Sequence, residues 1–146
     1  MLIPAEAYKQ IITSVPILCA DFIIIYDNKY LLVKRSYPPL QDCFWLPGGR
    51  MLLGESLRDS ASRILSRELS MRIHEETEIV LAGITNMIYD SSSLGYHVYH
   101  TPAIILQIQL YELPCITLDP TSSEFLWSPN LPPLFVTHFF ASNSYV

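Results

Sequence analysis

Apolar residues recur at helical spacing in two stretches of the chain. Residues 5–14 carry apolar side chains on one helical face and polar ones elsewhere, which predicts a short amphipathic helix. Residues 55–72 contain no proline or glycine, and their apolar side chains repeat at three- and four-residue steps. This second stretch predicts a helix of about five turns that packs one face on a core.

Other stretches follow the pattern of strands and turns. Residues 22–25 and 30–34 are rich in β-branched and aromatic side chains and flank Asp27-Asn28, so they predict a β-hairpin. The proline-containing stretch 36–41 predicts a loop, and residues 43–49 predict an extended segment that ends in a two-glycine turn.

The second half of the chain predicts two more strands, over residues 76–90 and 99–113. The second of these is nearly all apolar, so we expect it at the centre of a sheet. Residues 118–135 are expected to form a proline-rich tail, and residues 135–146 to add one helical turn. Together these elements predict an α/β sandwich around a mixed β-sheet, in a single domain over residues 1–146.

Composition narrows the function classes. Half of the 146 residues are apolar, and the net charge of −5 gives no general basic field for nucleic acid. A phosphate ligand would therefore need a few locally placed arginines. The chain has neither a leader pattern nor a run of roughly 18 apolar residues that would span a membrane. Three cysteines in no paired motif are expected to be reduced thiols, which predicts a cytoplasmic protein.

The stretch 46–69 carries the candidate chemistry. A Pro-Gly-Gly turn leads into the long helix, which presents Glu55, Arg63 and Glu68. One interpretation is a solvated helix face with an incidental ion pair. The other is a site, because the spacing of Gly49, Glu55, Arg63 and Glu68 resembles the Nudix box: G, five residues, E, seven residues, REUXEEXGU, where U is aliphatic.

The box departs from the general pattern at three positions. Ile64, Arg67 and Ser70 stand where the pattern has Glu, Glu and Gly, so two metal-binding carboxylates of ordinary Nudix enzymes are absent. The GDP-mannose mannosyl hydrolase branch of the Nudix superfamily shares this departure, and residues 5–72 are similar to that branch. The resemblance implies a Nudix-type α/β/α sandwich around a mixed β-sheet, a homodimer, and hydrolysis of a nucleoside diphosphate sugar. Water would attack the anomeric carbon, and GDP would leave.

The resemblance also implies roles for individual residues. The main-chain carbonyl of Gly48 and the carboxylate of Glu68 match two ligands of a single Mg²⁺. Arg35, Arg50 and Arg63 match the arginines that contact the diphosphate, and Arg50 and Arg63 are expected to act in catalysis. Arg35 also has a simpler interpretation, as a charge at a strand end.

The sugar side and the general base follow by the same resemblance. Asp21 matches a residue on the sugar side, although a turn former is the simpler interpretation. The Gln-His pair of that branch, whose histidine is the general base, aligns with Thr121-Ser122. Glu124 is therefore the candidate catalytic base, with His100 as an alternative.

Five other positions bear on the same expectation. Met87 and Ala103 align with a histidine and a tyrosine of the branch, and neither is kept. His97 is a further candidate base in the loop next to His100. Trp45 and Trp127 are aromatic rings that would either stack on a base or sugar or pack in the core.

Three functions stay open from the sequence. The first is Mg²⁺-dependent hydrolysis of a nucleoside diphosphate sugar such as GDP-mannose or GDP-glucose. The second is hydrolysis of another nucleoside diphosphate derivative by attack at phosphorus. The third is a catalytically silent protein that binds nucleotide sugars.

Overall fold

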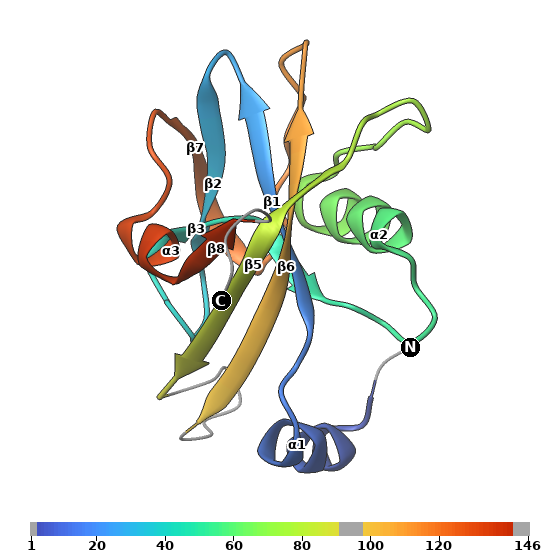
Figure 1. Cartoon of the computed structure of the whole chain (residues 1–146), viewed down its shortest axis with the longest axis vertical. Coiled ribbons are helices and arrows are strands. Elements are labelled where there is room, and N and C mark those ends of the chain that lie inside the picture. Colours follow the sequence, from blue (N-terminus) through green and yellow to red (C-terminus); the bar gives the residue numbers. More distant parts are fainter. Residues whose placement is uncertain (1–2, 91–97, 142–146) are drawn as a thin grey trace.

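The computed structural model describes residues 3–90 and 98–141, which form three helices and eight strands (Figure 1). The helices are α1 (Ala5–Ser14), α2 (Leu57–Leu69) and α3 (Pro133–His138). The strands are β1 (Cys19–Tyr26), β2 (Lys29–Arg35), β3 (Phe44–Trp45), β4 (Gly48–Arg50), β5 (Val80–Tyr89), β6 (Tyr99–Gln109), β7 (Ser122–Ser128) and β8 (Phe139–Ala141).

The strands form one mixed sheet in the order β3-β2-β1-β6-β5-β8, with β4 paired to β1 and β7 paired to β2. β1 and β6 run parallel, whereas the other described pairs are antiparallel. The apolar strand β6 lies between β1 and β5, which confirms the prediction that it is central. No helix in the described part of the chain is long and apolar enough to cross a bilayer.

Helices cover both faces of this sheet. Phe22 and Ile24 of β1 point into a core with the buried side chains of α2, whereas Ile23, between them, points into a second core with residues of α1 and α3. This alternation is the two-residue period of a strand. The structure therefore confirms the predicted α/β/α sandwich.

The first half of the chain follows its local signals closely. The helix predicted over residues 5–14 is α1, and the predicted hairpin is β1 and β2. Asp27 and Asn28 both have positive φ, at 49° and 56°, as a two-residue hairpin turn of the favoured hand requires.

The long helix is shorter than its hydrophobic pattern predicts, since it covers residues 57–69 and not 55–72. At its start, the Ser56 side chain accepts a hydrogen bond from Asp59 N, and the Asp59 side chain accepts one from Ser56 N. At its end, Ser70 has a left-handed φ of 54°. These two caps explain why the helix is shorter than the apolar pattern, which extends past both of its ends.

The proline-rich tail predicted over residues 118–135 was the main error in the fold. It contains strand β7, which pairs with β2 through contacts such as Leu31 opposite Trp127. Pro120 and Pro129 lie outside β7, so they bound the strand and do not interrupt its hydrogen bonds. Residues 135–141 form the end of α3 and the short strand β8, and residues 142–146 lie outside the described range.

The cap at Ser56 gives a direct test of this helix boundary. Ser56→Ala should lower the free energy of unfolding by about 1 kcal/mol, because it removes the acceptor for Asp59 N. Ser66→Ala is the matched control, since Ser66 is exposed in the middle of α2 and alanine favours a helix. Urea unfolding followed by circular dichroism measures both, and equal losses in the two variants would contradict the cap.

Candidate active site

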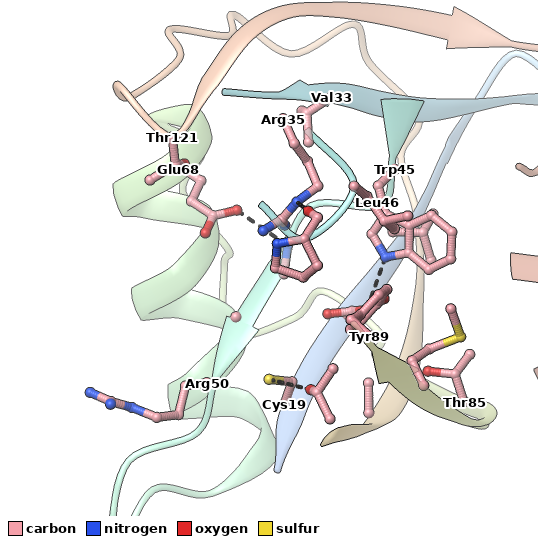
Figure 2. Close-up of a pocket in the computed structure, with 18 of the residues that line it drawn as sticks. Cys19, Val33, Arg35, Trp45, Leu46, Arg50, Glu68, Thr85, Tyr89 and Thr121 are labelled. Carbon is pink, nitrogen blue, oxygen red and sulfur yellow. Dashed lines mark hydrogen bonds between the residues drawn. The ribbon is translucent and has the colours of Figure 1, made fainter. Parts of the chain in front are cut away.

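A cavity of about 180 Å³ lies between the sheet, the β3–β4 segment and the last turn of α2. Five of the residues predicted for the site line it: Asp21, Arg35, Gly48, Arg50 and Glu68. Figure 2 shows Arg35, Glu68 and Thr121 toward one end of the cavity, and Cys19 and Thr85 toward the other. The structure therefore brings most of the predicted set together, with Arg35 and Glu68 toward one end and Arg50 beside Cys19, its partner in the sheet.

Glu68 is the buried carboxylate of this cavity, with 7% of the residue exposed. Its Oε2 accepts a hydrogen bond from Gly48 N at 3.2 Å, and its Oε1 accepts one from Arg67 Nη2 at 2.7 Å. Burial raises the pKa of Glu68, while these two donors oppose the rise. The carboxylate is thus held at the glycine turn by two N–H groups.

The glycine turn allows unusually close packing around Glu68. A Cβ at Gly48 would lie 2.1 Å from Asp21 Oδ1 and 2.8 Å from the carbonyl oxygen of Ala20. Only glycine fits at this distance. β4 can therefore pair directly with β1 at the Asp21–Gly48 position, which places the carboxylate of Asp21 beside the turn.

Asp21 is the second carboxylate in the cavity. Trp45 Nε1 donates a hydrogen bond to its Oδ2 at 3.4 Å. Burial raises the pKa of Asp21 to about 7, although the Trp45 hydrogen bond and the charge of Arg35 both lower it. A carboxyl group that titrates near neutral pH inside a cavity is a candidate for proton transfer.

Arg35 and Arg50 provide the positive charge at the cavity. Arg35 Nε donates to the carbonyl oxygen of Pro39 at 2.7 Å, which fixes the guanidinium beside the cavity. The Arg50 guanidinium lies 4.9 Å from the centre of the Tyr8 ring of α1. Figure 2 shows the Arg50 side chain extending away from Tyr89 and Trp45, so it lies at the rim.

The structure does not bring Arg63 to the cavity lining. Its Nε and Nη2 both donate to Glu55, and Nη2 also donates to the carbonyl oxygen of Arg50 at 2.9 Å. Arg63 also holds the pKa of Glu55 down, to about 2. These partners make Arg63 a positioning residue that holds the segment after β4 against α2. To contact a diphosphate as predicted, Arg63 would have to break its hydrogen bonds to Glu55 and Arg50.

Glu124 and His100, the candidate bases, also lie outside the lining. Glu124 is on β7 opposite Lys34 of β2, and its carboxylate pairs with Lys34 Nζ at 2.7 Å. It was expected in a loop, but β7 replaces that loop with a strand. His100 Nε2 lies 2.7 Å from Asn86 Oδ1. His97 lies outside the described residues.

The rest of the cavity is a wall that sequence analysis missed. Thr85 and Tyr89 of β5, Tyr99 and Thr101 of β6, and Cys19 of β1 line it. The Thr101 hydroxyl donates to Cys19 Sγ at 3.1 Å, and burial raises the pKa of Tyr89 and Tyr99. Thr85 is only 1% exposed, and its Oγ1 has no hydrogen-bond partner among the described residues.

The other aligned positions divide between cavity and core. Met87, Ala103, Thr121 and Ser122 line the cavity, as their alignment with site residues suggested. Trp45 lines it too, but its indole is buried and contacts Phe135 edge-on, with ring centres 5.9 Å apart.

Trp127 lies outside the lining. Its ring packs against Tyr26 with centres 5.7 Å apart, which fits the interpretation of this residue as packing. The three cysteines are all free, as expected for reduced thiols.

The space beside Glu68 and Gly49 suits a cation. Arg67 Nη2 already lies 2.7 Å from Glu68 Oε1, and a Cβ on Gly49 would lie 3.3 Å from that nitrogen. Within residues 3–90 and 98–141, no group of three or more His, Cys, Asp or Glu side chains surrounds a metal position. A metal ion here would therefore take further ligands from main-chain carbonyls, water and phosphate oxygens.

Comparison with solved structures identifies the fold. The MutT Nudix hydrolase from Burkholderia pseudomallei matches with a TM-score of 0.68 and 19% identity, over 85% of this chain and 95% of that one. The Nudix domain of NrtR from Shewanella oneidensis, solved with ADP-ribose, matches with a TM-score of 0.61 and 20% identity over 88% and 84%. The chain has the Nudix fold.

A third Nudix-fold match is a bifunctional NMN adenylyltransferase/ADP-ribose pyrophosphatase from Francisella tularensis, solved with AMP and a Mn ion. It matches with a TM-score of 0.53 and 19% identity, over 90% of this chain and 39% of that one. This neighbour is therefore one that was solved with a nucleotide and a divalent metal ion.

Sequence comparison finds two relatives that each match part of the chain. The chain is 39% identical over 56 residues to the ADP-ribose pyrophosphatase of Methanocaldococcus jannaschii, over 38% of this chain and 33% of that enzyme. It is 27% identical over 109 residues to the low-salt glycan biosynthesis protein Agl8 of Haloferax volcanii, over 74% and 68% of the two chains. No protein-family model matches the chain.

The raised pKa of Asp21 predicts a specific pH dependence of stability. The folded state favours protonated Asp21, so this contribution is complete below about pH 4, the unfolded pKa, and is lost as pH rises through about 7. In metal-free buffer, Asp21→Asn should be more stable than the natural protein at pH 8, and the difference should vanish near pH 4.

Urea midpoints measured from pH 4 to pH 8 test this expectation. Asp90→Asn is the matched control, because Asp90 is exposed at the end of β5. A constant difference between Asp21→Asn and the natural protein at every pH would contradict a titrating Asp21.

Proposed function

We propose that this Nudix-fold protein is a Mg²⁺-dependent hydrolase of a nucleoside diphosphate sugar of the GDP-mannose or GDP-glucose type. Water attacks the anomeric carbon, and GDP departs. The observation that carries the proposal is the two-ended cavity, in which Arg35 and Glu68 lie toward one end and a hydroxyl-rich wall lines the other. The identity of the base and sugar rests on the resemblance of residues 5–72 to the mannosyl hydrolase branch.

The charged end suits the diphosphate. Arg35 lies at this end, and its guanidinium presents paired N–H donors that match phosphate oxygens. Arg50 lies at the rim beside Cys19, from where it could meet a phosphate that extends out of the cavity. Glu68 and the main-chain carbonyl of Gly48 would hold Mg²⁺, which supplies positive charge to the departing diphosphate when bound. A leaving group that gains negative charge needs such preorganised cations more than it needs further carboxylates.

The other end suits a sugar ring. The cavity of about 180 Å³ has room for one small ring. Thr85 Oγ1 lacks a partner there, and a sugar hydroxyl would supply one. Asp21 lies on the same wall, with a pKa near 7 that suits it to accept a proton from water. For Glu124 to act as the base, its carboxylate would have to break its ion pair with Lys34.

A second candidate is hydrolysis of another nucleoside diphosphate derivative by attack at phosphorus. The similarity to an ADP-ribose pyrophosphatase and the NrtR domain solved with ADP-ribose favour it. Ile64 and Arg67 count against it, because they replace two carboxylates that phosphorus attack uses in the general box. A protein that binds nucleotide sugars without turnover is the third outcome.

The homodimer and the cytoplasmic location also remain proposals. Ile84 and Ile88 on β5 and Phe140 on β8 are exposed, and Ile84 lies directly opposite Phe140 in the sheet. This small apolar patch supports self-association. Nothing in the described residues indicates the compartment beyond the three free cysteines.

A panel of nucleoside diphosphate sugars with Mg²⁺ distinguishes the three functions. Release of free reducing sugar together with nucleoside diphosphate supports the proposal. Release of sugar phosphate and nucleoside monophosphate supports attack at phosphorus. Saturable binding without either product, measured by calorimetry, indicates a binding protein and contradicts the proposed hydrolysis.

Two variants test the charged end of the cavity. Arg35→Ala should lower kcat by about 100-fold, because it removes a preorganised donor to the departing diphosphate. Glu68→Gln should abolish Mg²⁺-dependent turnover, because it removes the buried anionic ligand. Arg72→Ala is the matched control, since Arg72 is exposed and lies outside the cavity lining. Normal activity in Arg35→Ala would contradict this placement of the diphosphate.

A further inference from the structure

Arg67 lies between two carboxylates that come from different segments. Its Nη2 is 2.7 Å from Glu68 Oε1, and its Nε is 3.8 Å from Asp119 Oδ2. The same Nη2 lies over Gly49, 3.3 Å from where a Cβ would be. One guanidinium therefore balances a carboxylate on α2 and another on the segment that leads into β7.

The second carboxylate is held firmly at that place. Asp119 N donates to the carbonyl oxygen of Glu68 at 3.1 Å, and Thr117 N donates to that of Leu69 at 3.0 Å. Asp119 Oδ1 accepts hydrogen bonds from the backbone N–H of Thr121, at 2.9 Å, and from the Thr121 hydroxyl. The segment is thus tied to the end of α2, and Asp119 cannot move away from Glu68 without breaking these bonds.

Arg67 is the cation that lies within 4 Å of both carboxylates. The Arg67 guanidinium can turn outward into water, because 51% of its side chain is already exposed. Glu68 is buried, so its carboxylate cannot turn outward in the same way.

We propose that Arg67 is a resident cation that competes with Mg²⁺ for Glu68. It balances Glu68 and Asp119 in the metal-free protein. Glu68 Oε2 already accepts the Gly48 N–H, so a bound Mg²⁺ and the guanidinium would both draw on the same buried carboxylate, and Arg67 would have to turn outward when the metal binds. This inference rests on the metal site of the proposed function. It assigns a role to Arg67 that the box pattern does not, since that pattern has a carboxylate at this position.

Direct metal binding to the nucleotide-free protein tests the competition. Mg²⁺ titrations by calorimetry, repeated with Mn²⁺ and detected by electron paramagnetic resonance, should show about tenfold tighter binding to Arg67→Ala than to the natural protein, a difference of about 1.4 kcal/mol. Arg72→Ala removes the same charge away from the site and should bind within about twofold of the natural protein. Adding Glu68→Gln to Arg67→Ala should abolish the gain.

Equal or weaker Mg²⁺ binding by Arg67→Ala would overturn the competition, as would no binding to either protein. Arg67→Met, which keeps the apolar stem, serves as the second variant if Arg67→Ala does not fold. The outcome is separable from that of the proposed function. A nucleotide-sugar panel without turnover would refute the hydrolase while leaving a tenfold gain in metal affinity intact.

Discussion

The hydrogen bond from Gly48 N to the buried carboxylate of Glu68 is the contact on which the rest of the site depends. A carboxylate taken out of water costs free energy unless donors meet it, and Gly48 and Arg67 supply those donors. Because Gly48 also pairs with Asp21, the same contact ties α2 to β4 and β4 to β1. These contacts therefore fix the positions of α2, the glycine turn and the cavity wall relative to one another.

This constraint explains how one box can serve different chemistry. In this chain the box keeps the carboxylate that the turn holds and replaces two others with Ile64 and Arg67. Ile64 is fully buried and extends the apolar core of α2, while Arg67 adds positive charge next to Glu68. The site thus has little negative charge with which to gather several metal ions. It instead has guanidinium groups beside Glu68 and Asp21, a balance that suits the departure of a diphosphate.

Local signals predicted the parts of the fold that local chemistry decides. The helical spacing of residues 5–14, the Asp27-Asn28 turn and the glycine turn lie within a few residues of the groups they control. The caps of α2 are equally local, but the apolar pattern concealed them, so that helix was predicted too long. Strand β7 was missed because its pairing with β2 joins residues about 90 positions apart, as in Lys34 and Glu124. Thr85 could not be found for the same reason, since its place on the wall depends on the register of β5 against β6. Arg63 shows that a correct motif position leaves open whether a guanidinium meets a ligand or a neighbouring carboxylate.

The central claim is that water attacks the sugar carbon and leaves the diphosphate whole, and isotope transfer tests it most directly. GDP-mannose would be hydrolysed with Mg²⁺ in water enriched in ¹⁸O, and the masses of the products would be measured by mass spectrometry. The account predicts one ¹⁸O atom in the released mannose and none in GDP. An ¹⁸O atom in GMP or in mannose 1-phosphate would mean attack at phosphorus and would contradict it.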